Sequence, residues 1–213
     1  MSLIRGKFIS LEGGEGAGKS TLLAGLREHI TAQRVSLVQT REPGGTPLGE
    51  AARAIVLDPA QRGMAAETEL LLMFASRAQL VREVIEPALA AGQWVLCDRF
   101  TDASYAYQGG GRGQPLERIA ELERWATDGL RPDLTLLLDL PVSTGRARAA
   151  GRGEADRIEV ETDAFFERVR SVYRARAAAE PLRFRVIDAS QPVAEVLQSA
   201  LAALAPFMVE HAQ

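Results

Sequence analysis

The fold class of this chain depends on one stretch of sequence, Gly13-Gly14-Glu15-Gly16-Ala17-Gly18-Lys19-Ser20, which fits the pattern G-x-x-x-x-G-K-[ST]. An apolar run at residues 8–11 precedes the stretch and a helical pattern follows it, so strand, loop and helix occur in the required order. Glycines let a backbone wrap closely around a polyphosphate, and the N–H groups of the loop and of the helix N-terminus point toward it. We therefore predict a phosphate-binding loop.

Two side chains of this loop have predicted roles in nucleotide binding. The ammonium group of Lys19 is expected to reach the β- and γ-phosphates, and the hydroxyl of Ser20 is expected to bind Mg²⁺. A glycine-rich turn without a ligand is the alternative, but such a turn needs neither Lys nor Ser at these offsets. The predicted ATP-phosphate site consists of Gly13, Gly14, Glu15, Gly16, Ala17, Gly18, Lys19, Ser20 and Thr21.

The composition is that of an ordinary globular protein. The 213 residues, of which 46% are hydrophobic, can bury a full core, most economically as one domain over residues 1–213. The formal net charge of −3 argues against a general nucleic-acid binder, which usually has a basic excess. Because no signal-peptide pattern is present and no apolar run approaches about 18 residues, we expect a cytoplasmic protein without a membrane partner.

Apolar runs alternate with segments of helical periodicity along the chain. The runs predict five buried strands, at residues 8–12, 35–40, 94–98, 134–139 and 184–188. The periodic segments predict helices at residues 67–90, 115–127, 142–150, 163–179 and 192–204. This alternation is typical of parallel sheets covered on both faces. The predicted fold is therefore α/β, with a five-stranded parallel sheet flanked by helices.

Two segments do not fit this alternation. Residues 41–47 contain too many turn-forming residues for a helix or strand, and they follow a strand, where the ligand loops of such sheets lie. Residues 146–157 contain four arginines among glycines and alanines. A solvated charged face is one interpretation of this run. In an acidic chain with a phosphate loop, we favour a mobile lid, at about residues 146–159, that closes over phosphate.

A second phosphate site would separate a kinase from other proteins with such a loop. Arg41, Arg53, Arg77 and Arg99 lie near strand ends or on helices, although each alone could form a surface ion pair. Arg99 follows Asp98 at the end of a predicted buried strand. We expect Asp98 to hold Mg²⁺ directly or through water.

The two histidines also bear on the reaction class. His29 lies on the helix after the phosphate loop and His211 near the C-terminus, so neither is placed as a general base. A hydroxyl acceptor would need such a base, whereas a phosphate monoester is already an anionic nucleophile at neutral pH. The sequence therefore favours transfer from ATP to another phosphate, helped by positioning and charge neutralisation.

Together these residues resemble the bacterial thymidylate kinases, which convert dTMP to dTDP with ATP. The resemblance covers nearly the whole chain and rests on residues 11–21, 40–47, 76–77, 98–100, 106–109, 131–134 and 153–159. It implies the P-loop NTPase fold with a mobile lid, ATP as donor, Mg²⁺ as cofactor, and a homodimer formed through helices. The alternatives are another nucleoside monophosphate kinase, which would need a different acceptor pocket, and a P-loop regulatory switch, which would not need two sets of arginines.

The resemblance also implies an acceptor site. Arg77 and Arg99 are expected to hold the dTMP phosphate, with Arg53 and Glu42 in the same pocket. Ser104 and Gln108 are expected at the thymine edge, and Tyr107 beside the sugar.

One position of the acceptor site departs from the family pattern. The family usually places an aromatic residue four positions before the arginine of the long helix, to stack on thymine. Here that position is Met73, and Phe74 lies three positions before Arg77. Both are close to Arg77 on a helix. We slightly prefer Phe74 as the stacking side chain and Met73 as the alternative.

On the donor side, the resemblance implies further roles. Glu15 is expected near the acceptor and the metal, so the predicted metal site is Ser20, Asp98 and Glu15, while Glu12 could act on the metal or only brace the loop. The catalytic groups are expected to be Lys19, Glu15, Arg99 and, from the lid, Arg152. The turn at Asp188 and Ala189 is expected to lie beside adenine, with Arg146 stacking nearby.

Overall fold

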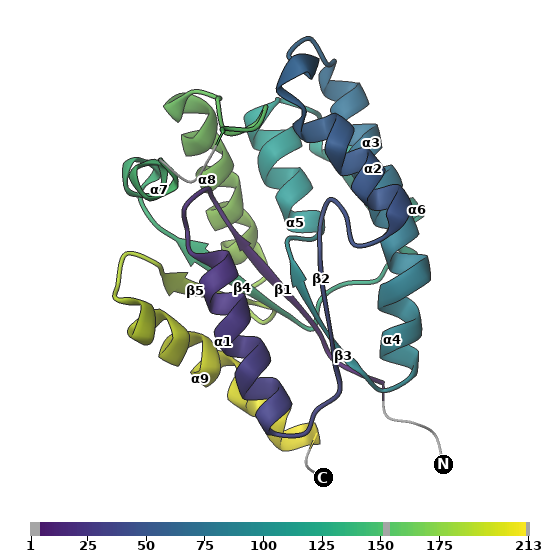
Figure 1. Cartoon of the computed structure of the whole chain (residues 1–213), viewed down its shortest axis with the longest axis vertical. Coiled ribbons are helices and arrows are strands. Elements are labelled where there is room, and N and C mark those ends of the chain that lie inside the picture. Colours follow the sequence, from purple (N-terminus) through teal and green to yellow (C-terminus); the bar gives the residue numbers. More distant parts are fainter. Residues whose placement is uncertain (1–4, 151–153, 212–213) are drawn as a thin grey trace.

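A five-stranded parallel sheet forms the centre of the chain in the computed structural model, which describes residues 5–150 and 154–211 (Figure 1). The strand order is β2-β3-β1-β4-β5, and all four neighbouring pairs are parallel. The strands are β1 (Phe8–Gly13), β2 (Leu37–Arg41), β3 (Trp94–Asp98), β4 (Leu134–Asp139) and β5 (Phe184–Asp188). The predicted fold class is confirmed; β2 begins two residues later than expected, and β1 and β2 each end one residue later.

Helices cover both faces of the sheet. Successive residues of a strand point to opposite faces. In β3, Trp94 and Leu96 pack in the cluster that contains α1 (Lys19–Ala32) and α9 (Val193–His211). Val95 and Cys97 pack on the other face, where the helical segment at residues 66–90 lies. On that second face, Leu137 of β4 packs with α8 (Asp163–Ala179).

The predicted helix at residues 67–90 is present as one continuous helical segment with a local change of winding. The segment consists of α3 (Ala66–Leu80), a π-helical turn η2 (Val81–Ile85) and α4 (Glu86–Ala90). Pro87 lacks an N–H group and would clash with the carbonyl of residue 83 in a regular helix. The wider π turn just before it lets the helix continue. Helix α9 likewise continues past Pro206, beyond the predicted end at residue 204.

Two helical segments had no counterpart among the predicted elements. Helix α2 begins at Pro47, the last residue of the predicted loop, and the Thr46 hydroxyl caps it by accepting a hydrogen bond from the N–H of Gly49 at 3.0 Å. Helix α5 continues as the π helix η3, which runs into three consecutive glycines that disfavour helix on propensity alone. The remaining bounds are α2 (Pro47–Leu57), η1 (Pro59–Gln61), α5 (Thr101–Ser104), η3 (Tyr105–Gly111), α6 (Leu116–Thr127) and α7 (Val142–Ala149).

The order of the strands positions the functional loops. Strand β1 lies between β3 and β4, so the chain leaves β1 toward β2 on one side and later reaches β4 on the other. Ligands of open α/β sheets bind at the carboxyl ends of strands where the order reverses in this way. The loops after β1 and β3 lie at that edge. None of the helices within the described residues has both the length and the apolar character that a membrane span requires.

Candidate active site

The phosphate loop connects β1 to α1 at the carboxyl edge of the sheet. Gly18 stands before the first residue of α1 with a φ of 89°, and no side chain caps this helix. The first-turn N–H groups of α1 are therefore available for an anion. The Lys19 ammonium donates to the carbonyl oxygens of Gly13 and Gly14, at 3.1 Å each. The loop thus has the cradle and the cation that the sequence predicts.

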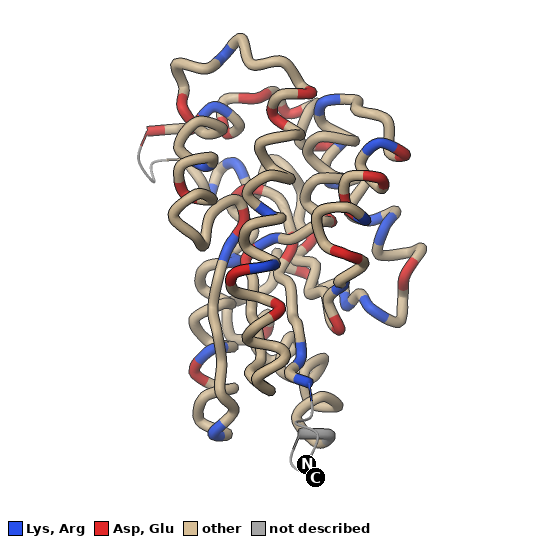
Figure 2. Tube along the Cα trace, turned by 90° about the vertical axis from the view of Figure 1, so that its right-hand side faces the viewer, with Lys and Arg blue, Asp and Glu red and all other residues tan. Residues whose placement is uncertain are grey.

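A cavity of about 380 Å³ lies beside the loop. Several segments contribute to it: the phosphate loop, the first residues after β3, helix α3, and the turn at residues 154–162, which we call the lid turn. The predicted site residues that line it are Glu15, Gly16, Ala17, Gly18, Lys19, Ser20, Thr21, Glu42, Arg53, Met73, Asp98, Arg99, Tyr107 and Gln108. Positive and negative residues are interspersed along the trace (Figure 2), so the cations at this cavity are a local feature.

Arg99 is held at the cavity by its backbone and by its side chain. Its φ of 70° is uncommon for a residue other than glycine and marks strain that the surroundings must hold in place. The guanidinium donates to the carbonyl oxygen of Gly13 at 2.8 Å and to Glu15 Oε1 at 2.7 Å, and it lies 4.8 Å from the Tyr107 ring centroid. Arg99 is therefore positioned before any ligand binds.

Glu15 shares one oxygen between two donors. Its Oε1 accepts from Arg99 at 2.7 Å and from the Tyr107 hydroxyl at 2.8 Å. Burial alone would raise the pKa of Glu15, but Arg99, Lys19 and the Tyr107 hydrogen bond hold that pKa below its usual value. Burial and the neighbouring Arg99 lower the pKa of Lys19. The loop therefore presents an ionised carboxylate between cationic groups.

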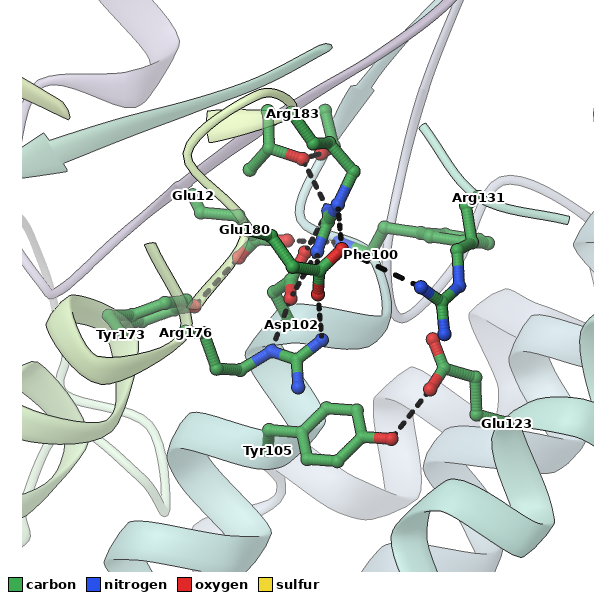
Figure 3. A network of polar contacts seen from close by, with 12 residues as sticks. Glu12, Phe100, Asp102, Tyr105, Glu123, Arg131, Tyr173, Arg176, Glu180 and Arg183 are labelled. Atoms are coloured by element: carbon green, nitrogen blue, oxygen red, sulfur yellow. Dashed lines mark hydrogen bonds and ion pairs between the residues drawn. The ribbon is translucent and has the colours of Figure 1, made fainter. Parts of the chain in front are cut away.

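Glu12 braces the segment after β3. One of its oxygens accepts from the N–H of Phe100 at 2.7 Å and the other from the Tyr173 hydroxyl at 2.7 Å (Figure 3). Burial, and next the nearby Asp102 carboxylate, raise the pKa of Glu12 to about 8. Because both oxygens have protein donors, the contacts favour bracing over metal binding.

Asp102 anchors the helix that carries the acceptor side of the cavity. It lies fully buried in α5, where Arg176 and Arg183 both pair with its carboxylate (Figure 3). These two arginines come from α8 and from the residue before β5. Contacts distant in sequence thus fix the orientation of α5 and η3, which bear Tyr107 and Gln108 at the cavity.

Arg77 does not occupy the position expected for a phosphate-binding group. Its side chain is fully buried and pairs with Glu42 at 2.6 Å. It also donates to the Ser104 hydroxyl at 3.0 Å and to the carbonyl oxygen of Phe100 at 3.1 Å. Neither Arg77 nor Ser104 lines the cavity. The structure therefore does not bring Arg77 to the cavity, because protein acceptors engage its donors.

Met73 and Phe74 exchange the roles that the sequence analysis preferred. Met73 lines the cavity. Phe74 instead packs in a core cluster with Leu70 and Tyr105, and the Arg77 guanidinium lies 4.5 Å from its ring centroid. The preference for Phe74 as a ligand contact is not supported, since consecutive helix positions point about 100° apart and α3 turns Met73 inward.

The donor side has a second, adjoining cavity of about 560 Å³. Gly18, Arg148 and Ala189 are among its lining residues, and Arg148 donates to the carbonyl oxygen of Ala189 at 2.7 Å. Arg146, expected here, instead pairs with Asp163 at 2.9 Å and donates to the carbonyl oxygen of residue 161. Arg148, and not Arg146, lines this cavity, because α7 turns residues 146 and 148 about 200° apart.

Asp188 shapes the turn beside this second cavity without lining it. Its Oδ1 accepts from the N–H of Ser190 at 2.9 Å. The hydrogen bond from Gln191, and then those from Ser190, lower the pKa of Asp188 to about 2. The carboxylate therefore serves the turn that presents Ala189, and it is not placed to contact a ligand in that cavity.

Asp98 is the side chain best suited to a cation. It lies at the carboxyl end of β3 and lines the cavity together with Ser20. Its Oδ1 is buried and has no hydrogen-bond partner among the described residues. A carboxylate oxygen and a hydroxyl are ligands that Mg²⁺ accepts while it keeps several waters. Within the same residues, no cluster of three or more acidic, Cys or His side chains is arranged as a complete metal cage.

The lid arginines have different fates. Arg152, predicted as the catalytic one, lies outside the described residues. Arg157 is buried and does not line the cavity; it donates to the carbonyl oxygen of Val56 at 2.7 Å and to Glu69 at 2.6 Å. Sequence reasoning did not identify Glu69, or the neighbouring lid residues Asp156 and Glu159 that line the cavity. No local motif marks these residues, since their contacts come from distant segments.

Known proteins match this chain over segments on both sides of the cavity. The thymidylate kinase family model matches residues 11–200. Thymidylate kinases from Pseudomonas syringae pv. tomato and Alkalilimnicola ehrlichii are 58% and 59% identical over 205 and 204 residues, which are 96% and 95% of this chain and 97% and 94% of theirs. The crystal structure of thymidylate kinase from Ehrlichia chaffeensis matches with a TM-score of 0.76 at 30% identity, over 94% of this chain and 98% of that one.

Proposed function

The chain belongs to the thymidylate kinase family and is an ATP-dependent kinase that converts dTMP to dTDP, and we propose that it does so in the cavity between the phosphate loop, α3 and the lid turn. The observation that carries this placement is the polarity of the cavity. Lys19, Arg53 and Arg99 lie among its lining residues on the phosphate side, whereas Met73 and Gln108 give it an apolar and amide-bearing side. A nucleoside monophosphate has the same polarity.

The donor is proposed to bind along the phosphate loop. The uncapped N-terminus of α1 and the Lys19 ammonium would hold the β- and γ-phosphates. The adenine would lie in the adjoining cavity, beside Ala189 and Arg148. The guanidinium plane of Arg148 can stack on a base, whereas Arg146 pairs with Asp163.

The acceptor is proposed to bind with its phosphate toward Arg53 and Arg99 and its base toward Met73 and Gln108. Arg53 donates one bond to the carbonyl oxygen of Pro43, at 3.1 Å, and the rest of its planar fork has no other hydrogen-bond partner among the described residues and could hold a phosphate. Tyr107 lies beside Arg99, where the sugar of a bound nucleotide would pass.

The proposed reaction is an in-line transfer between two phosphates. An oxygen of the dTMP phosphate forms a bond to the γ-phosphorus of ATP while the bond from that phosphorus to the bridging oxygen breaks, and ADP leaves with the oxygen. The acceptor oxygen is already ionised, so no general base is needed. Lys19 and Arg99 would neutralise charge that builds on the transferred group. Glu15 would position Arg99, and Arg152 stays a prediction for this role.

Mg²⁺ is the proposed cofactor. The unpartnered oxygen of Asp98 and the hydroxyl of Ser20 would hold it, directly or through water. Bound Mg²⁺ supplies positive charge to the donor phosphates. Glu15 is less suited to this role than the sequence suggested, because Arg99 and Tyr107 already engage its Oε1.

A coupled assay of ADP release tests the function. We expect turnover with ATP, Mg²⁺ and dTMP, and little with AMP, GMP or UMP. A slow release of ADP that no monophosphate accelerates would contradict the acceptor site and favour a regulatory nucleotide switch. Equal turnover with several monophosphates would point to a kinase of broader specificity.

A homodimer is the proposed assembly, through the surface of α3 and α6. Trp125 of α6 is 83% exposed and Leu71 of α3 is 56% exposed, and both line a groove of about 520 Å³ between the two helices. Large exposed apolar side chains that cluster in this way mark interaction surfaces. Sedimentation of the wild-type chain is expected to give a dimer, and W125E to give a monomer. Monomeric wild-type protein at micromolar concentration would contradict the proposal.

Two further expectations remain proposals. The chain is treated as one kinase domain over residues 1–213, with a lid at about 146–159, because the lid turn packs on the same cavity as the phosphate loop. The cytoplasm stays the predicted location.

A further inference from the structure

Glu69 joins three segments that are distant in sequence. It lies in the first turn of α3 and is 1% exposed. Its Oε1 accepts from Gln108 Nε2 of η3 at 2.9 Å, and its Oε2 accepts from Arg157 Nη2 of the lid turn at 2.6 Å. Arg112, which follows η3, donates to the same Oε2 at 3.1 Å and also pairs with Glu161 of the lid turn. One buried carboxylate thus connects α3, η3 and the lid turn.

The described partners of Glu69 are all donors. Two guanidinium groups and one side-chain amide reach its two oxygens. An ionised carboxylate only accepts hydrogen bonds. Gln108 must therefore turn its NH₂ group, and not its carbonyl oxygen, toward Glu69.

The carbonyl oxygen of Gln108 lies at the other end of this amide. Gln108 is fully buried and lines the proposed acceptor cavity. Its Oε1 has no hydrogen-bond partner among the described residues. With Nε2 held by Glu69, the unpartnered carbonyl oxygen is the group that the amide offers to a ligand in that cavity. An acceptor at this position suits a base whose pairing edge presents an N–H group.

We propose that Glu69 is a positioning residue for base selection, which fixes the Gln108 amide with its carbonyl oxygen toward the base. The inference rests on the proposed acceptor site. Thymine and uracil carry a hydrogen on N3, whereas cytosine has an unprotonated N3 that can only accept. With the amide fixed, cytosine would meet Gln108 acceptor to acceptor. Sites with buried polar groups that a wrong substrate leaves unpaired discriminate strongly.

The alternative is that Glu69 only neutralises the two arginines and supports the fold. The two roles predict different behaviour of E69Q. A glutamine at this position can donate to the Gln108 carbonyl oxygen, so the Gln108 amide can turn over and present NH₂ to the base. In the positioning role the preference for dTMP over dCMP falls. In the purely structural role the amount of active enzyme falls, which affects both ligands equally.

The test compares E69Q with the wild-type enzyme by calorimetric titration of dTMP and of dCMP and by steady-state kinetics with dTMP. We expect the ratio of the two dissociation constants to fall by about tenfold or more in E69Q, mostly through weaker dTMP binding. E83Q is the matched control, because Glu83 lies on the same helical segment, is exposed and accepts from the Gln79 amide at 2.8 Å. Its ratio is expected to equal that of the wild type.

A second variant keeps the proposal testable if E69Q does not fold. Q108M retains the length of the side chain but removes the amide, and it is expected to lose the same discrimination with Glu69 in place. An unchanged ratio in folded E69Q, or in Q108M, would overturn the proposal. Wild-type enzyme that does not turn over dTMP would instead refute the proposed function, so the two failures are distinguishable.

Discussion

The donor side and the acceptor side of the cavity are held by different means. On the donor side, backbone groups of one continuous loop form the site, and Lys19 bonds to carbonyl oxygens within six residues of itself. On the acceptor side, buried side chains hold one another across long stretches of sequence, as with Arg77 and Glu42, which are 35 residues apart. A short motif can therefore specify the first side, whereas only the folded chain specifies the second.

The largest expected effect concerns the donor side. Replacement of Lys19 by alanine removes the cation nearest the transferred phosphate, and we expect kcat to fall by about 10³-fold or more. The free energy of unfolding should change little, because Arg99 still donates to the Gly13 carbonyl and Gly14 is only half-buried. Steady-state kinetics and urea unfolding measure both quantities. Wild-type turnover in K19A would remove the loop from the mechanism.

A substitution on the acceptor side should mainly lower the free energy of unfolding. R77A leaves the buried Glu42 carboxylate without its partner, and the loss of one member of a buried pair costs about 3–5 kcal/mol. We expect a matching fall in the free energy of unfolding, measured with urea. R82A is the control, since its exposed pair with Glu86 is screened by solvent and should contribute far less to stability. Equal stability of R77A and R82A would break the contrast between the two sides.

Glu12 links the two sides and gives a pH dependence. Its pKa is about 8 in the folded chain against an ordinary value of 4.5, so the folded state binds the proton more tightly than the unfolded state. This contribution to stability is complete below about pH 4.5 and is lost as the pH rises toward 8. Between pH 5 and pH 8, the free energy of unfolding should therefore fall less in E12Q than in the wild type. Parallel profiles of E12Q and wild type would show that Glu12 does not titrate in this range.

The smallest expected effect separates two neighbouring residues of α3. M73A should raise the KM for dTMP roughly three- to tenfold, because an apolar contact with the base is lost. F74L should lower the free energy of unfolding by about 1 kcal/mol while leaving that KM unchanged. Steady-state kinetics and thermal unfolding of both variants distinguish them. A raised KM in F74L alone would restore the original preference for Phe74.

The fold could be predicted from sequence because its signals are local. Apolar runs and helical periods gave all five strands within two residues, and helix α8 at its observed bounds. The missed segments, α2 and η3, have proline or glycine where propensity argues against helix, and tertiary packing overrides it. Glycine residues 110 and 111 of η3, for example, lie so close to α8 that a Cβ there would meet Arg168 or Phe165.

The site could be predicted only in part, for a related reason. A lone arginine in a sequence shows its charge but not its partner. Arg77 and Arg157 both looked available for phosphate, and both prove to be committed to buried glutamates, Glu42 and Glu69. Arg99 differs because it directly follows a strand that ends at the phosphate loop, so topology alone places it at the cavity.

The positions of the two tryptophans give the chain two separate optical reporters. Trp94 is fully buried in the sheet, whereas Trp125 is 83% exposed on α6. Their fluorescence emission should therefore differ in wavelength and in access to an aqueous quencher. In W125F, the remaining emission follows unfolding of the sheet alone. In the wild-type chain, quencher access to Trp125 follows association of the α6 surface, so folding and assembly can be observed in one cuvette.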